Sequence, residues 1–206
     1  MFITFEGPDG SGKTTQLRSL ADFLCQHNYQ VLTTREPGGT IISEQIRSVL
    51  FDLKNTQMVP RTEILLFLAS RAQLVEEVIR PYLSTGGIVL CDRYADSTLA
   101  YQGYGHQLNL DQLKLLIDFA TGGLKPDLTL LLDLEVEEGL HRREQGGNWN
   151  RLDAYTLAFH QRVRHGFLEL TSEEPQRWVT IDAGRPADQV QKAIRQEVAA
   201  RLGIQQ

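Results

Sequence analysis

Cysteine is scarce in this 206-residue chain, and no segment is long and apolar enough to suggest a membrane span. The two cysteines, Cys25 and Cys91, form no Cys-x-x-Cys pair and have no histidine nearby at metal-ligand spacing. We therefore expect both to be buried thiols in a reducing cytosol. The chain opens on a strand-like segment (1–7) with neither a basic nor a long apolar leader, so we expect no secretion signal and a cytoplasmic location.

An excess of positive charge is also missing. The formal net charge is −5, whereas proteins that bind nucleic acid or membrane surfaces generally carry a basic face. We therefore expect neither kind of partner. Any anionic ligand must be bound by a local cluster of positively charged groups. With 41% apolar residues and no linker, repeat or low-complexity tract, the chain is expected to form one α/β domain over residues 1–206.

Short β-type runs alternate with longer stretches of helical apolar spacing. The runs cover residues 2–6, 30–34, 87–92, 128–134 and 177–181. This alternation predicts a parallel sheet with helices on both faces, and the almost wholly apolar run at 128–132 suits a central strand. A long helix is expected from Pro60 to about Pro81, because one helical face gathers Ile64, Leu68, Val75, Ile79 and Leu83.

The residues after the first expected strand match Gly-x-x-x-x-Gly-Lys-[Ser/Thr], the phosphate-binding P-loop. The ATP-binding residues expected from it are Gly7, Pro8, Asp9, Gly10, Ser11, Gly12, Lys13, Thr14 and Thr15. Backbone N–H groups turn inward around the β-phosphate, Lys13 bridges β and γ oxygens, and the Thr14 hydroxyl binds Mg²⁺. The alternative is a plain glycine-rich turn.

A P-loop does not identify the acceptor, because GTPases, ATPases and small-molecule kinases share it. The chain has no Asn-Lys-x-Asp motif of the kind that reads guanine, which disfavours a GTPase. Asp92 ends an apolar strand, where a metal-holding acid stands in P-loop proteins, although a strand-end cap is the alternative.

Arginines supply candidate sites for a second phosphate. Arg35, Arg47 and Arg93 suit a dianionic group, because the guanidinium is a planar fork of donors. Arg47 alone could equally be a charge on a solvated helix face. Phe67 and Arg71 lie four residues apart on one helical face, so a flat ligand could stack on the ring and bond to the guanidinium. The alternative is a core phenylalanine and a surface arginine.

Three further motifs follow the P-loop: REPGGT at 35–40, LFLASR at 66–71 and DRYADSTLAYQG at 92–103. In this order they resemble the thymidylate kinase family, and the similarity runs from Phe2 to the final helix. The resemblance implies Mg²⁺-dependent transfer of the γ-phosphoryl group of ATP to dTMP, giving ADP and dTDP in dTTP synthesis. It also implies a P-loop fold with a five-stranded parallel sheet, a mobile lid and usually a homodimer.

The same resemblance gives roles to the matching residues. Phe67 would stack on thymine, Arg71 would read a carbonyl, and Thr98 and Gln102 would meet the base edge. The full set implied for dTMP is Asp9, Arg35, Glu36, Arg47, Phe67, Arg71, Arg93, Thr98 and Gln102. Asp9 would approach the sugar hydroxyl and the phosphate, while Asp92 and Glu36 resemble groups that organise Mg²⁺ directly or through water.

The lid is expected over residues 140–153. Some family members carry an arginine in the P-loop where this chain has Gly10, so the chain resembles the bacterial type that supplies arginines from the lid. Arg142 matches a residue that packs on adenine and belongs to the ATP site. Arg143 and Arg151 remain as candidates for stabilising charge. The implied catalytic residues are Lys13, Arg93, Arg143 and Arg151.

Two other functions stay open at this point. One is a kinase for another nucleoside monophosphate or a deoxynucleoside, and the other is a catalytically idle nucleotide-binding protein. The intact Lys13, Thr14, Asp92 and Arg93 argue against the second. The five histidines show no spacing for a metal site or a catalytic triad, and no chemistry is assigned to them.

Overall fold

Strands and helices alternate along the chain in the computed structural model, which describes residues 1–147 and 149–204. The strands are β1 (Phe2–Glu6), β2 (Val31–Arg35), β3 (Ile88–Asp92), β4 (Leu128–Asp133) and β5 (Trp178–Asp182). The α-helices are α1 (Lys13–Gln26), α2 (Ile41–Phe51), α3 (Pro60–Leu74), α4 (Arg80–Ser84), α5 (Ala95–Thr98), α6 (Leu110–Thr121), α7 (Val136–Gln145), α8 (Leu157–Glu173) and α9 (Ala187–Leu202). Two π-helical segments are η1 (Val75–Ile79) and η2 (Leu99–Gly105).

The five strands form one parallel sheet in the order β2-β3-β1-β4-β5, which confirms the predicted fold class. Each observed strand lies within one residue of its expected position. The first five residues of β4 are buried, as expected for a strand covered on both faces. In a sheet of this order, the carboxyl ends of β1 and β3 meet at the edge where ligands usually bind.

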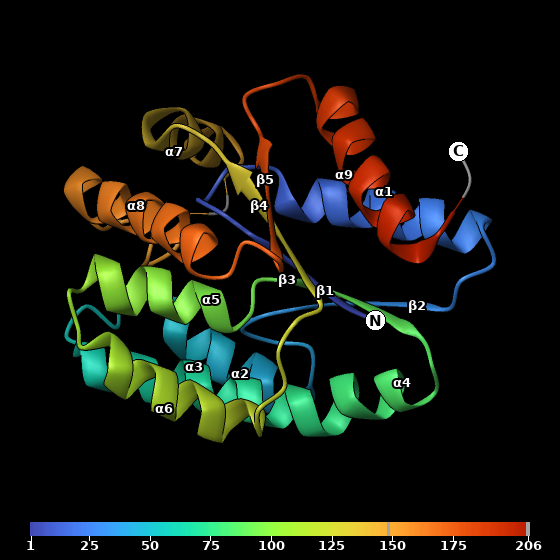
Figure 1. The fold of residues 1–206 in the computed structure, drawn as a ribbon. Helices are drawn as coiled ribbons and strands as arrows, with labels where there is room; N and C mark the ends of the chain where they lie inside the picture. Colours follow the sequence, from blue (N-terminus) through green and yellow to red (C-terminus); the bar gives the residue numbers. More distant parts are fainter. Residues whose placement is uncertain (148, 205–206) are drawn as a thin grey trace.

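Helices cover both faces of the sheet (Figure 1). On one face, α1 and α9 pack together against alternate strand residues such as Ile3, Phe5 and Leu130. On the other face, α3, α6, α8 and η2 enclose a second core that includes Leu131 and Phe167. The period of two along β1 and β4 therefore sends alternate side chains to opposite faces of the sheet.

The helix that begins at Pro60 continues beyond its expected end. It passes from α3 through η1 into α4 and ends at Ser84, so the boundary predicted near Pro81 was three residues short. Pro81 lies inside this continuous helix, two residues after the π-helical segment η1, and the helix runs on past it for three more residues. Leu74, Val75 and Ile79 are fully buried on its inner face.

The two thiols lie in different environments. Cys91 is buried in β3, as expected, but Cys25 is exposed, so that part of the prediction was wrong. The inner face of α1 is built from Leu17, Leu20 and Leu24, and the next residue points about 100° away from it. Both cysteines are free thiols.

The expected lid spans the end of α7 and the connection to α8, and its residue Asn148 lies outside the described residues. Among the described residues, no helix combines the length and the apolar character needed to cross a membrane.

Candidate active site

A cavity of about 380 Å³ opens at the carboxyl ends of β1 and β3. Its size suits a nucleotide-sized ligand. The predicted site residues line this cavity with four exceptions, which are Gly7, Pro8, Ser11 and Arg151. One cavity therefore joins the P-loop to the residues expected to bind the acceptor.

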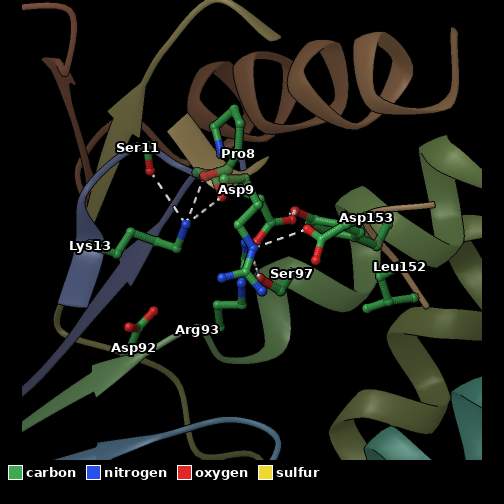
Figure 2. Close-up of polar contacts among 12 residues, drawn as sticks. Pro8, Asp9, Ser11, Lys13, Asp92, Arg93, Ser97, Leu152 and Asp153 are labelled. Carbon is green, nitrogen blue, oxygen red and sulfur yellow. Dashed lines mark hydrogen bonds and ion pairs between the residues drawn. The ribbon is translucent and has the colours of Figure 1, made fainter. Parts of the chain in front are cut away.

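The Lys13 ammonium folds back onto the P-loop (Figure 2). Its Nζ donates to Gly7 O at 3.1 Å, to Pro8 O at 2.7 Å and to Ser11 Oγ at 3.3 Å. Burial, with a smaller contribution from the positive Arg93, lowers the pKa of Lys13 to about 8. Three of the four predicted residues outside the cavity lining thus hold the lysine that faces it.

Gly10 explains why this P-loop carries no arginine at that position. Its φ is 77°, and a Cβ built there would stand 2.1 Å from Gly139 O in α7. The reverse contact is also close, because a Cβ on Gly139 would stand 2.4 Å from Asp9 O. The backbones of the P-loop and α7 therefore touch, and only glycine fits at the contact.

Asp9 and Arg93 form an ion pair inside the cavity (Figure 2). Arg93 Nη2 donates to Asp9 Oδ1 at 2.8 Å, and the Tyr101 hydroxyl donates to Asp9 Oδ2 at 2.6 Å. Arg93 Nη1 also donates to Ser97 Oγ at 3.1 Å. Burial opposes ionisation of Asp9, but the charges of Arg93 and Lys13 outweigh it and hold the pKa of that carboxyl far below its usual range.

Arg93 itself adopts a left-handed backbone with φ of 70°, which is uncommon for a residue with a side chain. Glu6, at the end of β1, holds the next residues in place. Its carboxyl oxygens accept from the Tyr94 N–H at 2.7 Å and from the Ser97 hydroxyl at 2.5 Å. The strand end therefore fixes the turn that aims Arg93 at the P-loop.

Thr14 and Asp92 meet at the expected metal position. The Thr14 hydroxyl donates to Asp92 Oδ2 at 2.5 Å. No cluster of three or more His, Cys, Asp and Glu side chains suited to a metal occurs in residues 1–147 and 149–204. Two protein oxygens fit Mg²⁺ in particular, because that ion usually takes one or two protein ligands and fills its shell with phosphates and water.

Arg71 is buried, so it is not the surface charge that the alternative interpretation allowed. Its Nε donates to Glu36 Oε2 at 2.8 Å and its Nη2 to Tyr94 O at 3.0 Å. Its Nη1 has no hydrogen-bond partner among the described residues. Phe67 is half-buried, lines the same cavity and belongs to none of the hydrophobic cores of the described chain. The cavity therefore presents two groups that a ligand can use, the Nη1 donor of Arg71 and the ring face of Phe67.

The other two arginines expected at the acceptor phosphate also line the cavity. Arg35 is half exposed and pairs with Glu44 at 3.0 Å. Arg47 donates to Pro37 O at 2.8 Å and covers the Phe51 ring at 4.3 Å. Arg47 is therefore not a solvated helix charge. Thr98 and Gln102 complete the lining from α5 and η2.

The three arginines of the expected lid lie in different surroundings. Arg142 pairs with Glu138 and donates to Ala183 O, which places it beside the turn after β5. Arg143 faces the cavity and donates to Asp153 Oδ1 at 3.1 Å. Arg151 is buried and outside the cavity lining.

Comparisons with known proteins agree with this arrangement. The sequence model of the family described as thymidylate kinase matches residues 5–194. The chain belongs to the thymidylate kinase family. A thymidylate kinase of Herpetosiphon aurantiacus is 54% identical, covering 89% of this chain and 89% of the relative. One from a Roseiflexus species is 50% identical, covering 94% and 91%.

A solved structure supports the same family. The crystal structure of thymidylate kinase from Ehrlichia chaffeensis superposes with a TM-score of 0.78 at 35% identity, covering 96% of this chain and 97% of that one. The resemblance inferred from the motifs is thereby confirmed, together with the P-loop fold.

Several residues that shape this thymidylate kinase site were missed by sequence reasoning. Tyr101 and Ser97 lie inside the DRYADSTLAYQG motif, so the motif marked them, but nothing local indicated contacts to Asp9 and Arg93. Glu6 was visible only as the last residue of a strand. Glu63 had no signal beyond its place on the Pro60 helix.

Proposed function

We propose that this chain transfers the γ-phosphoryl group of ATP to dTMP, giving ADP and dTDP. One observation carries the proposal: the cavity lined by the P-loop is also lined by Arg71, a buried arginine whose Nη1 makes no hydrogen bond to any described residue. A buried donor without a partner is costly unless a ligand accepts from it. Phe67 beside it offers the face on which a flat base can stack.

The ATP side follows from the P-loop geometry. Backbone N–H groups of residues 9–15 would surround the β-phosphate, and Lys13 would leave Gly7 O and Pro8 O to bind the β and γ oxygens. Thr14 and Asp92 would hold Mg²⁺, which would neutralise negative charge on the phosphates of ATP. Arg142 would pack on adenine, beside the turn after β5.

The acceptor side lies across the cavity from Lys13. Arg35, Arg47 and Arg93 would hold the 5′-phosphate of dTMP, and Asp9 would position its sugar while orienting Arg93. Glu36 would act through Arg71, because its ion pair with the guanidinium keeps Arg71 charged and fixes its position. Thr98 and Gln102 would meet the base edge together with Arg71.

Negative charge develops on the phosphoryl group during transfer, and Lys13 and Mg²⁺ would neutralise only part of it. A further cation is needed, and Gly10 has no side chain to supply one. We assign this role to lid arginines. Arg143 already faces the cavity, whereas Arg151 would have to leave its buried carboxylate partner, Glu63. Such an arginine is commonly worth about 10³ or more in rate.

The test is a substrate profile measured with ATP and Mg²⁺. We expect ADP and dTDP to form in equal amounts, with kcat/KM for dTMP above that for dCMP, dGMP and thymidine. Lys13→Ala is the control that should lower turnover about 10²-fold or more. A higher kcat/KM for another monophosphate or for thymidine would contradict the proposal, and nucleotide binding without turnover would favour an idle binding protein.

We further propose that residues 1–206 act as one domain and pair as a homodimer. The helices α2, α3 and α6 form one layer at the side of the molecule (Figure 1) and expose neighbouring apolar side chains. These are Ile41, Ile42, Val49, Leu65, Leu115, Leu116 and Phe119, the last of them 89% exposed. Patches of this kind mark interaction surfaces, and a two-fold axis would bury the same patch on both copies.

Sedimentation velocity tests the homodimer. Phe119→Asp should convert the protein to monomers, whereas Leu168→Asp, at an exposed apolar position on α8, should leave the mass unchanged. A parent protein that sediments as a monomer at micromolar concentration would contradict the pairing.

A further inference from the structure

Glu63 is a fully buried carboxylate on α3, one helical turn before Phe67. Four side chains surround it. Its Oε1 accepts from Gln102 Nε2 at 2.7 Å and lies 3.3 Å from His106 Nε2. Its Oε2 accepts from Arg151 Nη2 at 2.5 Å and from the Tyr155 hydroxyl at 3.1 Å.

The protonation state of Glu63 follows from these contacts. Burial by itself would raise its pKa, but hydrogen bonds from His106, Gln102 and Arg151 outweigh burial and lower the pKa to about 2. Glu63 is therefore an ionised carboxylate, which accepts hydrogen bonds and has none to donate. The side chains that contact it must present N–H or O–H groups.

This requirement fixes the amide of Gln102. Only its nitrogen can face the ionised Glu63, so its oxygen is the group left for a ligand. Within residues 1–147 and 149–204, the side chain of Gln102 makes one hydrogen bond, the one that it donates to Glu63. Gln102 and Arg71 both line the cavity, so between them these two side chains offer a base an acceptor, Gln102 Oε1, and a donor, Arg71 Nη1.

We propose that Glu63 is a positioning residue that determines base specificity through Gln102. On the basis of the proposed function, Glu63 would thereby select the base of the acceptor nucleotide. The donor and acceptor match a carbonyl next to a ring N–H, the edge of thymine and uracil. Cytosine presents the opposite pair, an amino donor next to an unprotonated ring nitrogen, and would leave both Arg71 and Gln102 unpaired.

The two oxygens of Glu63 divide their contacts between two parts of the molecule. Oε1 serves η2 through Gln102, whereas Oε2 serves the segment that leads into α8 through Arg151 and Tyr155. Arg151 Nη1 donates to the Tyr155 hydroxyl oxygen at 2.8 Å, so the hydroxyl gives its own proton to Glu63. A change at Tyr155 therefore alters the carboxylate without touching the oxygen that holds Gln102.

The first test compares Glu63→Gln with Tyr155→Phe. A neutral amide at position 63 can also donate, so it no longer forces the Gln102 nitrogen inward. We expect the ratio of kcat/KM for dTMP to that for dCMP to fall about tenfold, through a higher KM for dTMP, the effect of one buried hydrogen bond. Tyr155→Phe should keep the ratio within about twofold of the parent.

A double-mutant cycle separates this role from general support of the fold. In a Gln102→Leu background, Glu63→Gln should change the KM for dTMP by less than about twofold, because the amide that it controls is gone. Additive losses in KM, or an unchanged ratio in Glu63→Gln, would overturn the inference while leaving dTMP kinase activity of the parent intact. A parent that fails to phosphorylate dTMP would instead overturn the proposed function, and this inference with it.

A measurement on the unmutated protein applies if Glu63→Gln does not fold. Side-chain amide NMR should show slowly exchanging Gln102 Nε2 protons in the free protein, and they should stay protected and little shifted when dTMP binds. Fast exchange of these protons in the free protein, or a large shift on binding that marks a new bond to the ligand, would overturn the inference.

Discussion

The two candidate catalytic arginines of the lid segment should respond to substitution in opposite ways. Arg151 is buried and fully engaged, since Nε donates to Leu50 O at 2.9 Å while its other nitrogens contact Tyr155 and Glu63. Arg143 has a side chain that is 27% exposed and faces the cavity. Replacing each by methionine keeps much of the apolar stem and removes the charge.

The expected size of each effect follows from these surroundings. Arg151→Met leaves Glu63 buried without its cation, a change that costs about 3–5 kcal/mol. For a chain of this length, that loss lowers the Tm by about 6–20 °C. Arg143→Met should cost less than Arg151→Met, because the Arg143 side chain is 27% exposed and water can partly solvate its ion pair with Asp153.

The assay measures denaturant unfolding and kcat at saturating ATP and dTMP for the same proteins. Arg143→Met should lower kcat about 10³-fold with little change in dTMP affinity, because its contact forms mainly in the transition state. Arg18→Met, at an exposed position on α1, is the control for loss of an arginine.

Two outcomes would contradict these expectations. An Arg151→Met protein within about 1 kcal/mol of the parent would show that the buried pair contributes little in solution. A double variant of Arg143 and Arg151 that retains more than about a tenth of the parent kcat would rule out stabilisation by lid arginines, because the expected loss is several kcal/mol.

Three further predictions concern the remaining site. Lys13→Ala should lower kcat about 10²-fold or more with an unchanged Tm, since the lysine neutralises phosphate charge; near-normal turnover would remove the P-loop assignment. Arg71→Ala and Gln102→Ala should each raise the KM for dTMP about tenfold while the Kd for ATP, measured by calorimetry, stays within about twofold; equal losses would place them in the wrong pocket. Burial and the Asp96 carboxylate raise the pKa of Glu6 from 4.5 to about 8, so the folded state holds a proton that the unfolded state loses. The stability that this group contributes is fully present below pH 4.5 and is lost as the pH rises through about 8. The free energy of unfolding of the parent, measured with denaturant, should therefore fall relative to that of Glu6→Gln across this range. Parallel curves of unfolding free energy against pH would contradict the shift.

Local patterns in the sequence carried most of the fold. The strands were recognisable because apolar runs and helical spacing alternate, and these depend on neighbours along the chain. Cys25 was misplaced because a helix buries only one face, and composition does not say which residue lies just beside it. The end of the Pro60 helix was misjudged because the helix runs on past Pro81, directly after the π-helical segment η1.

The site was predictable where a motif names a residue and less so where a role depends on distant partners. Lys13 and Arg93 stand inside motifs, and both line the cavity. Glu63 and Arg151 are 88 residues apart in sequence and meet only through packing of the folded chain. No spacing rule predicts a contact between residues so far apart in sequence. The sequence alone therefore could not show that Arg151 is held in a buried ion pair with Glu63.

The close approach of Gly10 and Gly139 restricts how this enzyme can change over time. A single replacement of Gly10 by arginine would drive the new side chain into the backbone of α7 before it could reach a phosphate. The P-loop and α7 would have to separate first, and that separation would move Arg142 and Arg143, which the same helix carries. Under the proposed function, one substitution therefore cannot move the phosphate-stabilising arginine from the lid to the P-loop. Variants that carry only some of the necessary changes should be poor enzymes.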